Sequence, residues 1–249
     1  MAGHSKWHNI QHRKGRQDAK RGKIFTKVTK EIFLAARMGG GDPNTNNRLK
    51  SAIESAKAVN LPKDKIDTAI KKGTGELASE SIDEVFYEGY GPGGAAMLIE
   101  AATDNKNRTV AEIRHLLSKG GGSMGESGCV AWMFDNMGVI SFEKEACSEE
   151  QVLEAGVEAG VEDIVDDGQV WQARCAPEDF VQVRQAYDDA GMKYVEAQVT
   201  MIPKNTVEVD AETGRKLLNL YEALDDHDDV QNVYSNFDLP EELLQELEQ

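Results

Sequence analysis

The sequence has few cysteines, and they are not spaced as pairs. Cys129, Cys147 and Cys175 are odd in number and far apart along the 249 residues, which excludes a disulfide framework and a CxxC metal or redox pair. No apolar run approaches the roughly 20 residues that span a bilayer, so no membrane partner is expected. Residues 1–7 lack the apolar core of a secretory signal. These absences predict a reducing, cytoplasmic setting.

Signatures of catalysis and cofactor binding are also lacking. The sequence has no Walker A motif and no HExxH. Residues 121–125 match GxSxG, but a nucleophile elbow joins a strand to a helix. Here the match follows a predicted helix at 106–119 and precedes a predicted strand at 128–134, so a glycine loop is the better interpretation. We predict no enzymatic activity, no catalytic residues and no cofactor.

Charge is distributed very unevenly along the chain. The total of 44 acidic and 28 basic residues leaves a formal net charge of −16. Residues 1–75 carry 17 Lys and Arg against 6 Asp and Glu, a balance of +11, whereas residues 76–249 have a balance of −27. A basic segment of this kind favours a polyanionic partner, and the acidic remainder would repel that partner elsewhere and orient it.

The basic residues near the start of the chain are the candidate nucleic-acid site. Lys and Arg neutralise phosphates and release counterions, while Trp and His can stack on exposed bases. An ordinary solvated helix face is the alternative, although such faces normally mix both signs of charge. The candidate nucleic-acid-binding residues are His4, Lys6, Trp7, His12, Arg13, Lys14, Lys20, Arg21, Lys23, Lys27 and Lys30.

Three histidines in this segment have a spacing that merits a metal hypothesis. On a helix, His4, His8 and His12 would share one face. No carboxylate or cysteine completes a zinc site, and the surrounding cations disfavour a metal ion. We therefore predict no metal site, and contact with phosphates or bases is the preferred role.

Hydrophobic periodicity divides the chain into a helical part and a mixed part. Residues 1–22 are polar and basic. From Lys23 to Met38 the apolar residues recur with a helical period. Phe33 and Leu34 lie off the apolar face of this helix and are expected to touch a neighbouring domain or the ligand. Asp42-Pro43 is a start signal for the next helix. Beyond the linker at 73–81, strands and helices alternate, and 137–202 follows the β-α-β-β-α-β order of a ferredoxin-like domain.

The predicted fold class is α+β: a helical N-terminal bundle followed by two α/β domains, one ferredoxin-like and inserted into the other. Insertion at a surface loop is physically cheap. The predicted domains are the basic arm and helical bundle at 1–75, a discontinuous α/β domain at 76–135 plus 203–249, and the inserted ferredoxin-like domain at 136–202.

Two further segments are candidates for contacts. Residues 89–94 match GxGxxG, but a strand follows where the dinucleotide fingerprint needs a helix, and Pro92 removes an amide. A tight turn between strands is predicted, and contact with RNA or a partner is the functional alternative for Tyr90, Gly91, Pro92, Gly93 and Gly94. The acidic cluster 225–229 lacks the spacing of a calcium loop, so we expect a solvated loop that repels nucleic acid; a divalent cation is the alternative.

Several long segments resemble the YebC/PmpR family. The resemblance runs from Met1 to about Phe237. The segments that carry it are MAGHSKWHNIQHRKGRQDAKRGKIFTK, EGYGPGGAAMLIEAATDNKNRTVAEIRH, SMGESGCVAWMF, MGVISFEK, VTMIPKN and DDVQNVYSNF.

The resemblance implies a three-domain cytoplasmic protein without enzymatic activity or cofactor. Members of that family are described as probable DNA-binding transcriptional regulators. Related members, including a mitochondrial translational activator, act on translation and on ribosomes slowed at proline-rich stretches. The resemblance thus favours a DNA-binding regulator of transcription. The alternative is a translation factor that binds the ribosome, through ribosomal or transfer RNA, and relieves stalling at proline-rich stretches.

Overall fold

The computed structural model describes residues 21–78 and 81–248. Within that range the chain forms two compact units. One comprises residues 21–131 together with Glu212–Ser235, and the other comprises Trp132–Ala211 together with residues 236–248. None of the helices in the described ranges is long and apolar enough to cross a membrane. The domain boundaries drawn from the sequence stay predictions.

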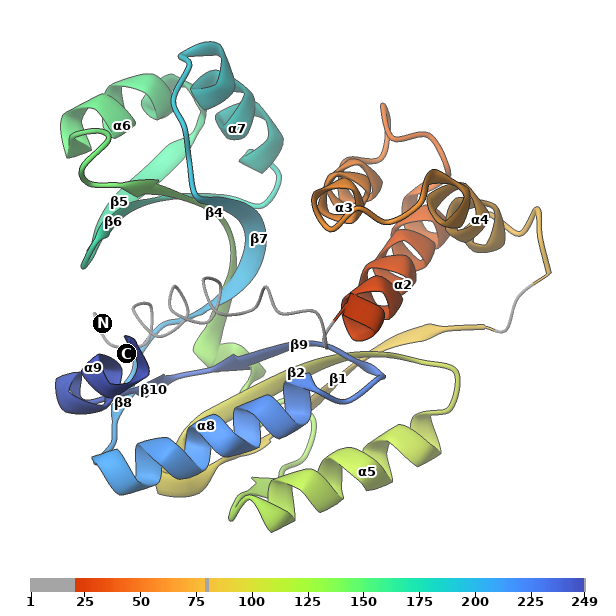
Figure 1. Ribbon diagram of the computed structural model, residues 1–249, viewed down its shortest axis with the longest axis vertical. Coiled ribbons are helices and arrows are strands. Elements are labelled where there is room, and N and C mark those ends of the chain that lie inside the picture. Colours follow the sequence, from red (N-terminus) through yellow and green to blue (C-terminus); the bar gives the residue numbers. More distant parts are fainter. Residues whose placement is uncertain (1–20, 79–80, 249) are drawn as a thin grey trace. The chain divides into compact units, whose positions relative to one another are not determined.

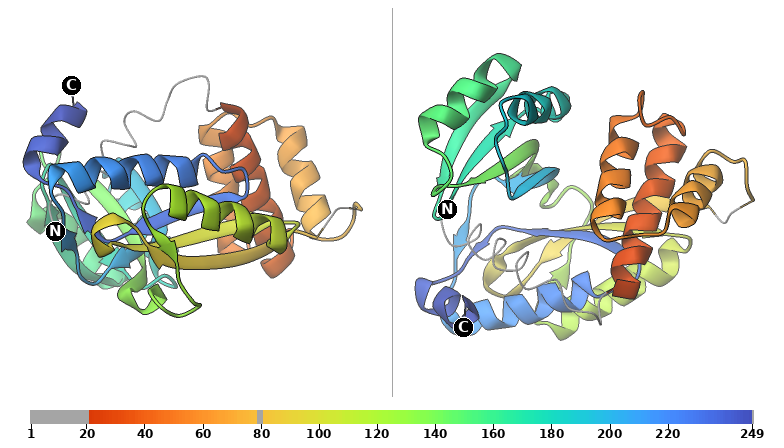
Figure 2. Two further views of the ribbon diagram at one scale, coloured as in Figure 1. Left: turned by 90° about the horizontal axis from the view of Figure 1, so that it is seen from below. Right: turned by 45° about the horizontal axis from the view of Figure 1, so that its top comes forward.

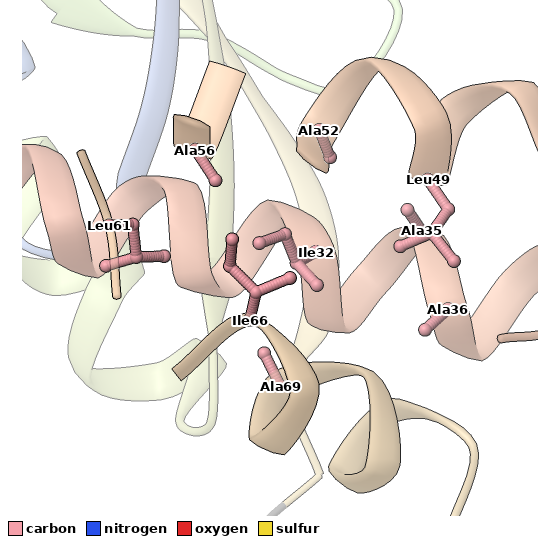
Figure 3. Packing of buried hydrophobic residues seen from close by; sticks show 9 residues of the cluster. All are labelled: Ile32, Ala35, Ala36, Leu49, Ala52, Ala56, Leu61, Ile66 and Ala69. Carbon is pink, nitrogen blue, oxygen red and sulfur yellow. The ribbon is translucent and has the colours of Figure 1, made fainter. Parts of the chain in front are cut away.

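The first unit begins with a three-helix bundle, seen close by in Figure 3. Its helices are α2 (Arg21–Gly39), α3 (Asn47–Ala58) and α4 (Lys63–Gly73). Small alanines on α2 and α3 let the helices approach closely, and larger side chains fill the remaining space. The buried residues of this core are Ile32, Ala35, Ala36, Leu49, Ala52, Ala56, Leu61, Ile66 and Ala69.

The start of α3 differs from the prediction. Asp42-Pro43 does not begin the helix, because residues 43–45 form a turn and Asn46 is the N-cap. The Asn46 side-chain oxygen accepts from the Leu49 N–H at 3.1 Å, and its amide donates to the Ala35 carbonyl at 2.7 Å. The buried side chain of Asn46 therefore caps α3 and connects it to α2. The start signal at Asp42-Pro43 does not predict this connection.

A four-stranded sheet completes the first unit. Its strands, in the order β3-β1-β2-β9, are all antiparallel to their neighbours. Figures 1 and 2 show α5 and α8 side by side on one face of this sheet. The elements are β1 (Asp83–Tyr90), β2 (Ala96–Thr103), α5 (Lys106–Lys119), β3 (Ser123–Met124), α8 (Ala211–Asp225) and β9 (Val230–Ser235).

Helix α2 packs on this sheet through the two residues that lie off its own apolar face. Phe33 and Leu34 are buried against Ala102 of β2, with Ile82 beside them. Of the two contacts expected for these residues, a neighbouring domain or the ligand, the structure shows packing on the sheet of the same unit. It buries apolar side chains that would otherwise be exposed on the bundle, and so joins the bundle to the sheet.

The second unit contains a ferredoxin-like sheet with order β5-β6-β4-β7, in which every neighbouring pair is antiparallel. Helices α6 and α7 cover one face (Figure 1), where Phe142 and Tyr187 stack edge to face at 4.7 Å. This confirms the predicted ferredoxin-like order. The elements are β4 (Phe134–Glu143), α6 (Glu149–Gly156), β5 (Val161–Asp167), β6 (Val170–Cys175), α7 (Phe180–Asp189) and β7 (Glu196–Pro203).

The remaining elements of the second unit are short. Strands β8 (Val207–Glu208) and β10 (Phe237–Asp238) pair in parallel, and α9 spans Glu241–Glu248.

The predicted strand at 128–134 is wrong. Residues 128–130 form a turn and a bend, a short 3-10 helix covers Ala131–Met133, and β4 starts at Phe134. The reason is Glu88 on β1, whose carboxylate accepts backbone N–H groups of Gly128, Val130 and Ala131 at 2.6–2.8 Å. The Glu88 carboxylate thus binds the backbone N–H groups that a strand at these positions would donate to a neighbouring strand.

Candidate nucleic-acid interface

The candidate residues of the basic arm fall largely outside the part of the chain that the structure describes. These are His4, Lys6, Trp7, His12, Arg13, Lys14 and Lys20. Arg21 begins α2, and Lys23, Lys27 and Lys30 follow on the same helix. Spacings of four and three residues put these three lysines on one face, which we call the α2 lysine row.

The α2 lysine row is paired with acidic residues that lie about two hundred positions later in the chain. Lys27 Nζ is 2.7 Å from Asp225 Oδ1. Lys23 Nζ donates to the Asp226 carbonyl at 2.7 Å and lies 3.7 Å from Asp226 Oδ1. The partners follow one another at the end of α8, so the row and the acidic residues run alongside each other within one unit.

Lys30 makes the most extensive contacts of the row. Its Nζ donates to Asp229 Oδ1 at 2.9 Å and to the carbonyls of Ala102 and Asp228 at 3.0 and 2.8 Å. Three acceptors satisfy all three ammonium donors. Lys30 is therefore a fixed connection between the bundle and the sheet, and its charge is already neutralised.

Asp229 is the centre of the polar contacts that surround Lys30. Its Oδ2 accepts from Arg108 at 2.7 Å and from Thr109 at 2.8 Å, and Thr103 lies 3.3 Å away. Burial alone would raise the pKa of this carboxyl, but the hydrogen bonds from Arg108, Lys30 and Thr109 outweigh burial and hold the pKa well below its usual range. Asp229 is thus a buried carboxylate that stays ionised because it is fully paired.

The acidic cluster 225–229 is therefore not the solvated loop that the sequence predicted. Asp229 is buried, His227 Nε2 lies 2.9 Å from Glu112, and the Asp229 N–H donates to His227 Nδ1. The carboxylates of Asp225 and Asp229 hold lysines of α2. The pairing partners were missed because nothing local in the sequence links residues so far apart; opposite charge was the only available signal.

Exposure falls along the α2 lysine row. The side chain of Lys23 is 44% exposed, that of Lys27 is 19% and that of Lys30 is 16%. The end of the row nearest the basic arm is thus the most open to solvent. The described lysines on α3 and α4 do not form a comparable row, because Glu54, Asp64 and Asp67 are interspersed among them.

The predicted turn between strands is confirmed, and it places its five residues unequally. Gly91 is buried, and a Cβ there would lie 2.7 Å from a methyl of Leu217. The Tyr90 hydroxyl donates to the Cys129 carbonyl at 3.2 Å. Gly93 and Gly94 are exposed and have φ values of 72° and 79°, which favour glycine. Only the tip of the turn is free to meet a partner.

The two glycine segments noted in the sequence lie against each other. A Cβ on Gly122 would come within 2.4 Å of the Tyr90 carbonyl, and one on Gly89 within 2.4 Å of the Ser123 carbonyl. Strand β3 pairs with the end of β1 at this point. Close backbone approach explains these glycines, and the GxSxG match needs no nucleophile.

A second polar cluster, which the sequence did not predict, joins α2 and α3 to the sheet. Arg48 donates to both Glu31 and Glu84, and the nearby Glu100 accepts from Asn232 and Tyr234. Burial and the charges of Glu31 and Glu84 raise the pKa of Glu100, and the two hydrogen bonds offset this only in part. Arg48 thus pairs with two carboxylates, and the third, Glu100, is held by the neutral donors of Asn232 and Tyr234.

These features define an α+β protein with a basic helical N-terminal part, an antiparallel sheet covered by two helices, and a ferredoxin-like sheet. Residues 5–76 match the family model "TACO1/YebC protein N-terminal domain", and residues 82–237 match "TACO1/YebC second and third domain". The chain belongs to the TACO1/YebC family, which confirms the resemblance seen in the sequence.

Similar proteins span the whole chain. A protein of Solidesulfovibrio magneticus is 65% identical over 243 residues, covering 98% of this chain and 99% of its own length. One of Maridesulfovibrio salexigens is 63% identical over 248 residues, with both chains covered in full. Both are named probable transcriptional regulatory proteins. The crystal structure of a conserved hypothetical protein from Aquifex aeolicus has a TM-score of 0.81 and 45% identity, and the match covers 92% of this chain and 94% of that one.

Proposed function

We propose that this protein binds DNA and regulates transcription without catalysing a reaction. The observation that carries the proposal is the charge split, with +11 in residues 1–75 and −27 in the rest of the chain. A basic segment attached to an acidic body favours a polyanion at one end only. The names of the relatives, probable transcriptional regulatory proteins, support the choice of DNA.

The contacts of α2 affect which basic residues are available to bind phosphates. The α2 lysine row is engaged by aspartates, whereas the arm before it has Asp18 as its only acidic residue. The arm residues Lys6, Arg13, Lys14 and Lys20 are therefore proposed as the principal phosphate contacts, with Trp7 stacking on bases. The tip of the turn at Gly93 is proposed as a secondary contact.

Binding of this kind discriminates weakly between DNA sequences. Lysine is a point charge on a flexible stem, so it positions a protein on the phosphate backbone better than it reads base edges. We expect random-sequence competitor DNA to displace a specific probe at less than roughly 100-fold excess, below the usual ratio of about 10³–10⁷ for operator-binding proteins.

A salt titration tests the proposal. Affinity of the full chain for a random-sequence DNA duplex should fall steeply with salt, with a slope near −0.9 for each phosphate neutralised. The variant Lys6→Ala/Arg13→Ala/Lys14→Ala should weaken binding on all sequences and reduce the slope by about 2–3.

The matched control removes three exposed lysines of α4, at positions 63, 65 and 71, which are interspersed with acidic residues. This control changes the net charge by the same amount and should leave the slope nearly intact. Equal losses in the arm variant and the control would show that net charge alone matters and that the arm is not the site. Absence of salt-dependent DNA binding would refute the proposal.

A further inference from the structure

We infer that the outer part of the α2 lysine row, Lys23 and Lys27, is a phosphate-binding surface that Asp225 and Asp226 cover in the free protein. Nucleic acid would displace these aspartates and take their place on the lysines. The inference rests on the proposed function. It adds a second phosphate-binding surface, and it identifies two aspartates of the same chain that compete with nucleic acid for that surface.

The contacts themselves resemble those of a lysine with a phosphate. Lys27 Nζ meets a carboxylate oxygen of Asp225 at 2.7 Å, and Lys23 Nζ meets the carbonyl of Asp226 at 2.7 Å with the carboxylate at 3.7 Å. An ammonium group donates to a negatively charged phosphate oxygen at about the same distance. The two aspartates are adjacent, as successive phosphates are on a nucleic-acid strand.

The aspartates of the two outer pairs, Lys23–Asp226 and Lys27–Asp225, are exposed enough for a competing anion to replace them. The side chains of Asp225 and Asp226 are 36% and 51% exposed, so a ligand in solution can reach both pairs without unfolding of the protein. Ion pairs this open to water are weak and are screened by salt. A polyanion that offers several phosphates at once can therefore compete with them.

The inner pair behaves differently. Lys30 has three acceptors, and its partner Asp229 is buried and also held by Arg108 and Thr109. This pair keeps α2 on the sheet while the outer pairs exchange. Lys30 is for this reason excluded from the phosphate-binding surface, and it stays in place in every variant below.

Position along the chain also favours this surface. Lys23 lies only three residues after Lys20, the last candidate of the basic arm. A strand bound by the arm would continue directly onto the open end of the α2 lysine row, where exposure is greatest.

The test compares two charge-matched double variants of the full chain. Asp225→Asn/Asp226→Asn removes the two carboxylates that face Lys27 and Lys23, while the backbone carbonyl of Asp226 stays as an acceptor for Lys23. Glu222→Gln/Asp228→Asn removes the same charge from exposed side chains in the same region for which no ion pair is seen among the described residues. The probe is a random-sequence DNA duplex, titrated by fluorescence anisotropy at several salt concentrations.

The first variant should bind the duplex more tightly than the control by about fivefold, the equivalent of one surface ion pair. Its salt slope should also be steeper than that of the control by about 1–2, since two more phosphates are neutralised. Adding Lys23→Ala/Lys27→Ala to the first variant should abolish both gains. Thermal unfolding of each variant verifies that the fold is retained.

The outcomes separate this inference from the proposed function. Equal affinities and slopes in the two double variants would overturn the inference, since the aspartates would then act by general repulsion alone. A gain that survives removal of Lys23 and Lys27 would overturn it as well. If the wild type does not bind the duplex but Asp225→Asn/Asp226→Asn does, and if this binding needs Lys23 and Lys27, the inference is supported. If neither binds the duplex at any salt concentration, the proposed function and the inference both fail.

Discussion

Asp229→Asn should be the most damaging conservative change at the junction of bundle and sheet. The amide keeps the shape of the side chain but loses its charge, and its NH₂ group would face the donors of Lys30 or Arg108. Each hydrogen bond to a charged group contributes about 1.5–3 kcal/mol. Lys30 is only 16% exposed and cannot be fully rehydrated, whereas Arg108 is 43% exposed and recovers part of its loss in water. We expect the free energy of unfolding to fall by about 2–4 kcal/mol.

Urea unfolding followed by circular dichroism measures this loss, and hydrogen exchange of peptides from α2 and β9 localises it. Asp228→Asn is the matched control: its side chain is exposed, and only its backbone carbonyl contacts Lys30. The control should stay within about 0.5 kcal/mol of the wild type. Equal stabilities of the two variants would show that Asp229 does not hold the bundle on the sheet.

The pH dependence offers an independent check of the same residue. The pKa of Asp229 is lowered in the folded state, so its contribution is complete above the unfolded value of about 3.9 and is lost as pH falls through the folded value. Wild type and Asp229→Asn should therefore differ most at neutral pH and converge in strong acid. A difference that stays constant from pH 7 to pH 2 would contradict the assignment.

Two further predictions concern Glu100 and Gly93. The pKa of Glu100 is raised, so its contribution is full below the unfolded value of about 4.3 and is lost as pH rises through the folded value. Glu100→Gln should then raise the melting temperature more at pH 8 than at pH 4, which lies below the unfolded value, and a uniform shift would argue against a destabilising buried carboxylate. Gly93→Val forces a branched side chain into a left-handed conformation and should cost about 1–3 kcal/mol in urea unfolding, whereas Gly93→Asn should cost less. We expect Gly93→Val to harm cellular function more than affinity for random duplex DNA; a matching loss of affinity would place the turn in the principal interface.

Local patterns in the sequence predicted most of the elements, because each depends on neighbours along the chain. Helix α2 follows from its apolar period, and the turn before β2 follows from its glycines and proline. Contacts over long separations were not predictable in the same way. Lys27 and Asp225 are 198 residues apart, and Glu88 takes backbone donors that lie about forty residues later in a segment with a strand-like composition.

The candidate site illustrates the same limit. Composition identified the basic segment and the acidic cluster correctly, but treated them as separate features. The fold brings Lys23, Lys27 and Lys30 onto that cluster, which divides the predicted site into a paired helix and an arm. Only the folded arrangement reveals which positive charges are already neutralised.

Crosslinking in cells tests the central claim most directly. The protein is crosslinked to nucleic acid, purified under denaturing conditions, and the attached DNA and RNA are both sequenced. A variant with Lys6, Arg13 and Lys14 changed to Ala is processed in parallel. The account predicts that DNA is recovered well above the level of this variant. Recovery of ribosomal or transfer RNA, with DNA no higher than in the variant, would contradict it and favour a translation factor.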